Sequence, residues 1–497
     1  MKISAKSLTF MVIGGMAAGG AVFAQQSAGS VKPIAALDTI PVAMPVEVLD
    51  SLYSYSTPQS VALNDPAAAP QGKILKLSRE ECIAIALQDN PTIRVADLEV
   101  KRVDYSKKEV LGSLFPSIDF SGAYQRTIDL QTMRMNIGGQ SQSLKVGSQN
   151  TWNFAFAASM PIISPTLWKS IQLTDVQILA ALESSRSSKL ELVNQVNQAY
   201  YSLLLAIATR DVLQENYDIA KINADIYKKQ FEYGTASEYD VLRSNVALKN
   251  IEPELLQADI SIKQCKLQLK VLMGMDYEAD IEPTVSLAEM QRDMYAYPLG
   301  AGDNISNNSS LRTLDIQRKL LGKTVTMKKF AYLPTLGVSY NLSWLSLSNG
   351  NPFKNQQFNP YSTVGLGLSV PIFSGGARYH AVKQAEVQLK ELEFQREYLV
   401  NSLNMQVELA LDNINREAEQ IASNAESMRQ AMKAHEIMQK SFEIGAATYL
   451  DLRDSELAST TAQLAYYQAI YNFLVSTSEL DLLLGKEDFI NNNNSKK

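Results

Sequence analysis

The sequence predicts a mixed α and β protein in which one unit of strands and very long helices occurs twice. Three observations lead to this fold class: an internal repeat, two runs of 68 residues without Gly or Pro, and four segments in which apolar and polar residues alternate. Helices in soluble proteins average roughly 11–12 residues, so an ordinary globular core does not account for runs of this length.

The N-terminus has the features of a secretory signal. Lysines precede an apolar stretch from Leu8 to Val22, and a small-residue cleavage site ends at Ala24. We therefore expect residues 1–24 to be a signal peptide. Residues 25–72 are rich in Ala, Pro, Ser and Gln, which predicts a flexible N-terminal extension. No later stretch has 18 or more uninterrupted apolar residues.

Composition excludes several classes of protein. A net charge of -6 argues against nucleic acid binding, which usually requires a basic patch. Two histidines, His380 and His435, leave little for a metal site, and we expect no cofactor. Two cysteines, Cys82 and Cys265, build no disulfide framework, although a single bond between them remains open.

The internal repeat has a constant offset. The segment Phe231 to Ser237 recurs 211 residues later as Phe442 to Thr448, and Gly274 recurs at the same offset as Gly485. The period is far longer than that of solenoid repeats, so it indicates a duplicated domain. We expect two structural repeats at 73–284 and 309–487, an inter-repeat link at 285–308 and a disordered tail at 488–497.

Each repeat begins with shorter helices and two strand-like segments. Ser78 and Glu81 form a capping box for a first helix, which pauses near Asn90-Pro91. The strands are expected at 115–130 and 150–162 in the first repeat and at 333–347 and 361–373 in the second. Alternation with a period of two places the apolar residues on one face of a sheet, as in a membrane barrel or in the half-buried sheet of a soluble protein. The Gly-, Asn-, Gln- and Ser-rich linkers 131–149 and 348–360 are expected to be surface loops.

A very long helix follows each strand pair. Residues 166–233 and 377–444 contain neither Gly nor Pro, and each run of 68 residues would extend roughly 100 Å as a helix. After a Gly-containing turn, residues 235–273 and 446–484 form a return run, interrupted in the first copy by Pro253. The first long helix carries a coiled-coil seam at Leu192, Val196, Ala199, Leu203 and Ala206. Each repeat is therefore expected to contain an antiparallel coiled-coil hairpin.

One chain does not have enough elements to enclose a space. About eight strands are the minimum for a barrel that spans a membrane, and open sheet edges are not tolerated in lipid. Either the four strands belong to a soluble protein, or several chains pool them. Three chains would supply twelve strands, and their helical hairpins would form a cylinder side by side.

At this point the sequence resembles the TolC-like outer-membrane efflux protein family, over roughly residues 75–487. The motifs that carry the resemblance are individually weak, but they are duplicated, in order and at the right spacing. They are Leu77-Ser78-x-x-Glu81, Leu114-Phe115-Pro116-Ser117, Val370-Pro371-Ile372-Phe373-Ser374-Gly375-Gly376 and the paired Gly-x-x-[ST]-x-x-Asp-[VL] tips at Gly234 and Gly445.

The resemblance implies a mixed α and β membrane protein: a homotrimer with a 12-stranded β-barrel, four strands per chain, continued by a long α-helical coiled-coil barrel. It implies a passive exit duct in the outer membrane that projects into the periplasm, in a tripartite efflux or type I secretion system. The implied partners are a periplasmic adaptor (membrane fusion) protein, an inner-membrane transporter and outer-membrane lipid. A mixed region near 275–308 and the C-terminal tail is also implied.

The family closes its periplasmic end with aspartates from the second hairpin, and these correspond to Asp451 and Asp454. A ring of carboxylates would attract cations, and crowding would raise some of their pKa values. The alternative is that Asp451 only caps its helix, as Asp240 would at the matching place in the first repeat. The residues expected at the hairpin tips, where an adaptor docks, are Gly234, Thr235, Ser237, Asp240, Gly445 and Thr448.

The sequence departs from the family in the polar contacts that hold the closed state. The family's tyrosine and arginine are replaced by Phe442 and Ala447, which cannot form those hydrogen bonds. Closure would then rest on packing or on other ion pairs. Arg243, Arg453, Glu232 or Glu443 would supply such pairs, unless they are simply solvated residues of the tips.

Three other functions were weighed against a duct. An enzyme is disfavoured because the sequence has no nucleotide-binding glycine loop, nucleophile elbow or metal-ligand cluster. A periplasmic coiled-coil adaptor or scaffold would carry similar hairpins, but not four amphipathic strands placed between long helices. An adhesion or assembly protein of the same membrane is the third alternative. The sequence does not identify a cargo.

Overall fold

The computed structural model describes residues 74–487, except 138–139, 277–278, 295–303 and 355. These residues belong to one compact unit, Ala68–Lys497. The expected signal peptide (1–24), the N-terminal extension (25–72) and the C-terminal tail (488–497) lie outside the described residues, as does part of the inter-repeat link.

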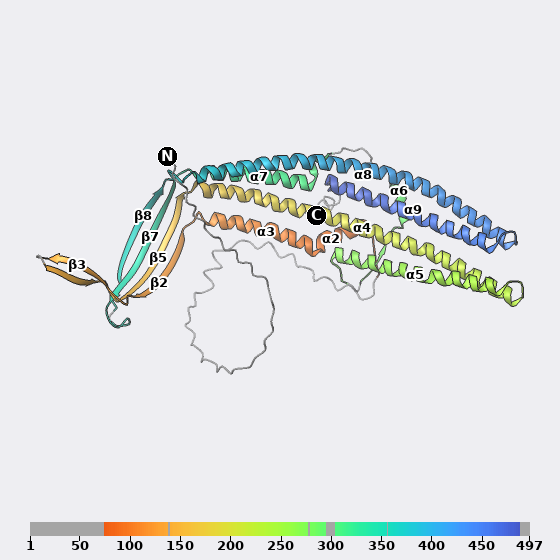
Figure 1. Ribbon diagram of the computed structural model, residues 1–497, viewed down its shortest axis with the longest axis horizontal. Coiled ribbons are helices and arrows are strands. Elements are labelled where there is room, and N and C mark those ends of the chain that lie inside the picture. Colours follow the sequence, from red (N-terminus) through yellow and green to blue (C-terminus); the bar gives the residue numbers. More distant parts are fainter. Residues whose placement is uncertain (1–73, 138–139, 277–278, 295–303, 355, 488–497) are drawn as a thin grey trace, which may run out of the picture. The chain divides into compact units, whose positions relative to one another are not determined.

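A four-stranded antiparallel sheet has the strand order β2-β5-β7-β8 (Figure 1). The first repeat supplies the neighbouring strands β2 and β5, and the second repeat supplies β7 and β8. The two repeats therefore meet in the sheet where β5 pairs with β7. Each of its strands lies in or close to one of the four segments in which alternation predicted a strand. Their bounds are β2 (Ser117–Arg126), β5 (Asn150–Ile163), β7 (Thr335–Ser348) and β8 (Asn359–Ser369).

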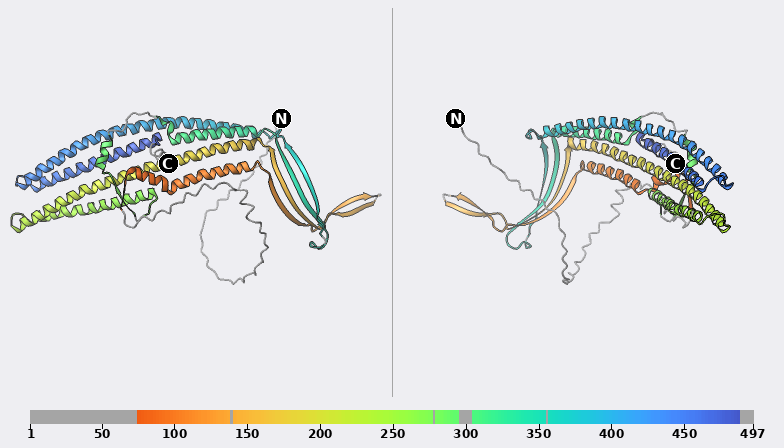
Figure 2. Two further views of the ribbon diagram at one scale, coloured as in Figure 1. Left: turned by 180° about the vertical axis from the view of Figure 1, so that it is seen from behind. Right: turned by 45° about the vertical axis from the view of Figure 1, so that its right-hand side comes forward.

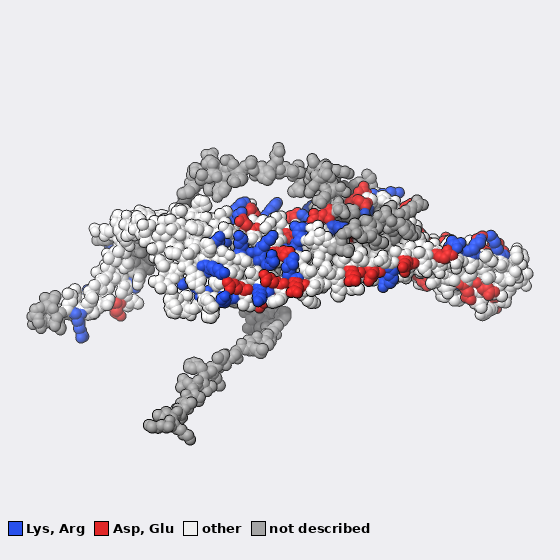
Figure 3. Space-filling model, turned by 90° about the horizontal axis from the view of Figure 1, so that it is seen from above, with Lys and Arg blue, Asp and Glu red and all other residues white. Residues whose placement is uncertain are grey.

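The two faces of this sheet differ in polarity. The register aligns large apolar side chains of all four strands on one face, and Ser, Thr, Asn, Gly and Ala predominate on the other. Within the four strands only Asp119 and Arg126 are charged. Figure 3 shows a surface with few charged side chains over the strands and many over the helices. The apolar face carries Ile118, Phe120, Tyr124, Trp152, Phe154, Phe156, Met160, Val338, Tyr340, Leu342, Trp344, Val364, Leu366 and Leu368.

The linker between β2 and β5 is not the loop that its composition predicted. Within 131–149 the chain forms an antiparallel hairpin of β3 (Gln131–Ile137) and β4 (Gln140–Val146). Here Met133 and Met135 alternate with polar residues, and Met133 pairs with Leu144. The expectation was wrong because the Gly and Gln content obscured this period-two pattern.

The long helices form two antiparallel hairpins. In the first repeat α4 (Pro165–Glu232) is followed by α5 (Glu238–Met273), and in the second α8 (Ala377–Glu443) is followed by α9 (Tyr449–Leu484) (Figures 1 and 2). These bounds confirm the predicted runs closely. The interruption at Pro253 does not occur, because α5 continues through this residue.

Three shorter helices are α2 (Arg79–Asp89), α3 (Pro91–Gly112) and α7 (Ser309–Phe330). The capping box predicted at Ser78 and Glu81 is present, and the pause at Asn90 separates α2 from α3. Helix α4 packs against α3, α5, α7 and α9, whereas α8 packs against α7 and α9. The helices therefore lie in four rows, in which α3 and α5 form one edge row and α8 forms the other (Figure 1).

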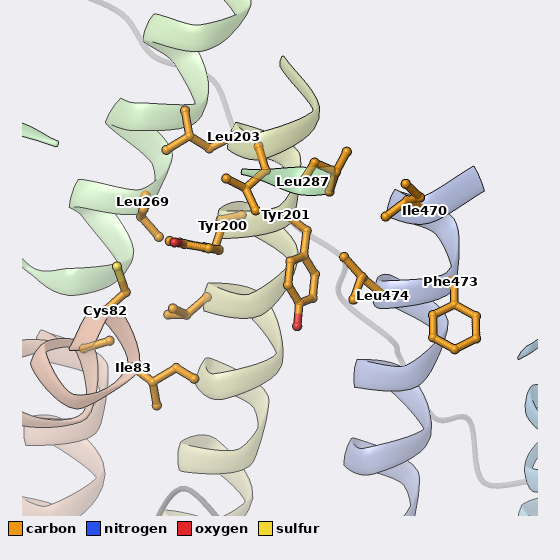
Figure 4. Packing of buried hydrophobic residues seen from close by; sticks show 14 of the residues in the cluster. Cys82, Ile83, Tyr200, Tyr201, Leu203, Leu269, Leu287, Ile470, Phe473 and Leu474 are labelled. Atoms are coloured by element: carbon orange, nitrogen blue, oxygen red, sulfur yellow. The ribbon is translucent and has the colours of Figure 1, made fainter. Parts of the chain in front are cut away.

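The hydrophobic core lies where α2, α4, α5 and α9 meet a small mixed region. Tyr200 and Leu203 of α4 are 1% and 0% exposed, and Ile470 of α9 is 0% exposed (Figure 4). Part of the expected coiled-coil seam, including Val196, belongs to this core. The mixed region comprises β1 (Ile74–Leu77), which pairs in parallel with β6 (Asp280–Pro283), together with α6 (Leu287–Met294) and a 3-10 turn (Ile305–Asn307).

The duplication also repeats a buried asparagine contact. The side-chain amide of Asn90 donates to the carbonyl of Leu272 at 2.8 Å and its oxygen caps α3. In the second repeat Asn308 donates to the carbonyl of Leu483 at 2.8 Å and caps α7. Each asparagine thus joins the start of one helix to the end of the return helix in the same repeat.

A left-handed glycine lies beside each asparagine contact. Gly274 and Gly485 end α5 and α9 with φ of +67° and +63°. A Cβ at Gly274 would lie 2.7 Å from the carbonyl oxygen of Asp89, and one at Gly485 only 2.2 Å from that of Asn307. Glycine is required at both positions, because no side chain fits the backbone conformation or the space.

Candidate functional site

The two hairpin tips have the same backbone geometry. Gly234 and Gly445 adopt φ of +72° and +76°, and nothing lies within 4 Å of the place where a Cβ would stand. In both turns an amide beyond the glycine reaches back to a carbonyl of the preceding helix, from Thr235 to Gln230 and from Ala446 to Ser441, each at 2.8 Å. The repeated sequence therefore gives the same open turn at both hairpin tips.

Each tip carries an aspartate in a capping box. The hydroxyl of Thr448 donates to Asp451 at 2.6 Å, and the hydroxyl of Ser237 donates to Asp240 at 2.6 Å. These side-chain hydrogen bonds, joined by one from the backbone amide, hold the pKa of both aspartates below the ordinary value. Asp451 and Asp240 thus both stabilise the first turn of the return helix, as the capping alternative expected.

Asp454 has a different environment. It lies one turn beyond Asp451, is exposed, and borders a shallow groove of about 560 Å³ between α8 and α9. Small side chains, among them Ala458 and Ala465, line the rest of the groove together with Asn424. Among the described residues no hydrogen bond or ion pair is recorded for Asp454, so its carboxylate is available to solvent and ions.

The residues that replace the family's polar contacts are packed differently. Phe442 packs against two tyrosine rings, with centroid distances of 6.1 Å to Tyr227 and 6.4 Å to Tyr449. Ala447 is half-buried in the turn. The guanidinium of Arg243 lies 5.4 Å from the centre of the Tyr449 ring. Arg243 was among the tip residues predicted to replace the family's contacts. Neither tyrosine was predicted, because nothing in the periodicity brings α4 and α9 together at this level of the hairpins.

Within the described part of the chain, the three other charged tip residues form no contact that bridges the hairpins. Arg453 pairs at 3.1 Å with Glu456, which is on the same helix and nearly buried. Glu232 and Glu443 are exposed at the ends of α4 and α8. Arg453 is thus engaged within α9, whereas Arg243 reaches across from one hairpin to the other.

Other candidate chemistry is limited in the part of the chain that the structure describes. Cys82 and Cys265 are unbonded, and burial raises the pKa of Cys82 to about 12. No group of three or more His, Cys, Asp or Glu residues is arranged to hold a metal among residues 74–487, apart from the gaps given above. Within the same residues, none of the helices has the length and apolar character needed to cross a membrane.

Comparison with known proteins identifies relatives along most of the chain. A model of the family "Outer membrane efflux protein" matches residues 82–275 and 302–486. The alkaline protease secretion protein AprF of Pseudomonas aeruginosa is 23% identical, over 84% of this chain and 88% of that protein. The outer membrane protein TolC of Escherichia coli is 20% identical, over 70% of this chain and 73% of that protein.

Solved structures share the fold. The outer membrane channel CmeC of Campylobacter jejuni aligns with a TM-score of 0.66 and 18% identity, over 84% of this chain and 89% of that one. The open state of the channel MtrE from Neisseria gonorrhoeae aligns with a TM-score of 0.64 and 17% identity, over 82% and 88%.

Proposed function

The chain belongs to the outer membrane efflux protein family, and from this membership we propose that three copies form a passive exit duct through the outer membrane. Each copy contributes four strands to a 12-stranded barrel and two hairpins to a helical barrel in the periplasm. The duct works in a tripartite efflux or type I secretion system and closes at the hairpin tips. It carries out no reaction.

The polarity of the four-stranded sheet carries this proposal. One face is a continuous apolar surface, on which Val364 and Leu366 are 74% and 72% exposed, and the opposite face is polar. The edge strands β2 and β8 have no strand partner on their outer sides within the described chain. A sheet of this kind is stable when copies join edge to edge, with lipid outside and water inside.

The edge rows of helices support the same assembly. Helix α8 carries an exposed apolar seam with spacings of seven and four, at Val387, Phe394, Tyr398, Met405 and Leu409. The opposite edge row has matching seams at Val95, Leu98 and Tyr105 of α3 and at Tyr239, Leu242, Val246, Leu256 and Ile260 of α5. If α8 of one copy packs on α3 and α5 of the next copy, the same contact can repeat head to tail from copy to copy. Such contacts form a closed ring when the rotation from one copy to the next is a whole fraction of a turn.

The strand count of one copy supports three copies in the ring. One copy has four strands and two copies have eight, which is about the smallest barrel and one that side chains would fill. Three copies give twelve strands and an interior open to passage. Because each copy supplies two equivalent units, the ring would have six-fold pseudo-symmetry.

The relatives indicate the kind of partners. AprF is named for alkaline protease secretion, and OpmQ of Pseudomonas aeruginosa for pyoverdine export. By analogy we propose that a periplasmic adaptor docks at the tips around Gly234 and Gly445, and that an inner-membrane transporter selects the cargo. The alternative that the chain is a periplasmic adaptor or scaffold protein is less well supported, because such a protein would have no use for the apolar face of the four-stranded sheet.

Fractionation tests the proposal directly. The full-length protein should be found in outer membranes as a trimer that survives detergent without heating and dissociates on boiling. Reconstituted trimers should conduct ions across a planar bilayer. Recovery of the protein as a soluble periplasmic monomer would refute the duct.

The aspartates of the second hairpin should govern cation passage. We expect the double variant Asp451→Asn/Asp454→Asn to lose block by multivalent cations by at least tenfold, because six carboxylates around the pore become neutral. Asparagine keeps an oxygen that can accept the Thr448 hydroxyl, so the cap is largely retained. Inhibition constants from planar-bilayer currents measure the effect.

The matched control is Asp240→Asn, the equivalent cap of the first repeat. It should leave cation block unchanged. Asp451 and Asp454 would be ruled out as the constriction if the double variant were blocked by cations as strongly as the wild type. They would also be ruled out if Asp240→Asn lost as much cation block as the double variant.

A further inference from the structure

Four helices each place one side chain in a cluster near the hairpin tips. Tyr227 comes from α4, Arg243 from α5, Phe442 from α8 and Tyr449 from α9. The rings of Tyr227 and Tyr449 meet edge to face with centroids 5.1 Å apart, and Phe442 packs on both. The guanidinium of Arg243 covers Tyr449 at 5.4 Å, which is within the range of a cation–π contact.

This cluster joins one hairpin to the other. Tyr227 and Arg243 belong to the α4–α5 hairpin, and Phe442 and Tyr449 to the α8–α9 hairpin. Tyr227 is only 7% exposed, and burial raises its pKa to about 12. Burial is also the main cause of the raised pKa of Tyr449. Both phenols therefore stay neutral across physiological pH.

The cluster is not an automatic result of the duplication. Phe231 is the equivalent of Phe442 at the constant offset, yet it is 47% exposed and no ring contact is recorded for it among the described residues. Tyr449 has Glu238 as its equivalent, and Arg243 corresponds to Asp454. The two repeats have diverged at these positions. The aromatic residues at the tip of the second hairpin pack onto the first hairpin, but the equivalent residues of the first hairpin do not form a matching cluster.

We propose that Tyr227, Arg243, Phe442 and Tyr449 form an aromatic latch, which holds the α8–α9 hairpin against the α4–α5 hairpin and keeps the narrow end of the duct closed. The inference rests on the proposed function, since it assumes a pore bounded by these hairpins. Edge-to-face and tilted ring contacts, together with a covering guanidinium, supply the attraction that the family's hydrogen bonds would otherwise supply. Asp451 and Asp454 lie on the same hairpin, so its release would move them outward from the pore axis.

Single-channel conductance of the reconstituted full-length trimer tests the latch. Phe442→Ala and Tyr449→Ala should each raise the conductance at least twofold, because the second hairpin is released. Tyr449→Phe keeps the ring and should match the wild type. Phe231→Ala is the matched control from the first repeat and should also match it. Arg243→Gln removes only the covering charge and should give an intermediate conductance.

The outcomes separate the latch from the duct. Wild-type conductance in Phe442→Ala and Tyr449→Ala, in trimers that conduct and respond to the aspartate substitutions, would overturn the latch and leave the duct intact. An increase in Tyr449→Phe or Phe231→Ala equal to that in Tyr449→Ala would also overturn it. If an alanine variant does not assemble, Arg243→Gln decides, since wild-type conductance there contradicts the cation–π contact.

Discussion

The double variant Val364→Arg/Leu366→Arg is expected to abolish assembly of the trimer in the outer membrane. Both side chains project from the apolar face of β8 and are largely exposed in the single chain. An arginine on the lipid face costs about 2–4 kcal/mol at the middle of the bilayer. Six such residues in a trimer would outweigh the marginal stability of most folded proteins. Heat-modifiable trimer in the outer-membrane fraction, measured by gel shift, should disappear.

The control substitutes the opposite face of the same strand. Thr363→Arg directly precedes Val364 in the strand; Thr363 pairs with Asn341 and points to the polar side. It should assemble near wild-type amounts, because a lumen accepts charge. If the double variant assembles as well as Thr363→Arg, the apolar face does not meet lipid and the sheet belongs to a different kind of assembly.

Gly485→Ala should destabilise the protein strongly. The left-handed conformation of this residue costs an alanine about 1–2 kcal/mol. A Cβ would also lie 2.2 Å from the carbonyl oxygen of Asn307, which is backbone and cannot rotate away. The end of α9 would have to move, and with it the hydrogen bond from Asn308 to Leu483. We expect the thermal midpoint of the trimer to fall by several degrees or assembly to fail.

Gly445→Ala isolates the first of these effects, the conformational cost. It has a similar φ of +76° but open space at the place of the Cβ. It should show only the conformational cost, and at a tip that contributes little to the core. Equal losses of stability in Gly445→Ala and Gly485→Ala would mean that the close approach at Asn307 does not matter.

Much of the fold was predictable because its signals are local and long. The absence of Gly and Pro defined α4 and α8 to within a residue or two, and the period-two pattern placed the four strands of the large sheet. The constant offset predicted that both hairpins turn at an equivalent glycine, and Gly234 and Gly445 do share one conformation. The number of chains in the assembly remains a proposal.

What escaped prediction depends on contacts between distant segments. The pairing of β1 with β6 joins two four-residue strands about 200 residues apart, and neither is long enough to carry a pattern. The packing of Tyr227 on Tyr449 requires the register of α4 against α9, which the apolar seam of either helix does not fix. One signal of this divergence is present in the sequence: the constant offset aligns Arg243 with Asp454, a reversal of charge at equivalent positions.

The packing of α9 into the core has a consequence for how the protein is made. The side chain of Leu474 in α9 faces Tyr201 of α4 (Figure 4), and the hydroxyls of Ser202 and Tyr471 meet across 269 residues of sequence. A chain that is exported N-terminus first must keep the apolar surface of α4 exposed until its last long helix arrives. Contacts so distant in sequence form late and leave aggregation-prone intermediates. Biogenesis should therefore depend on periplasmic holdase chaperones, and chains truncated before Tyr449 should be degraded rather than assembled.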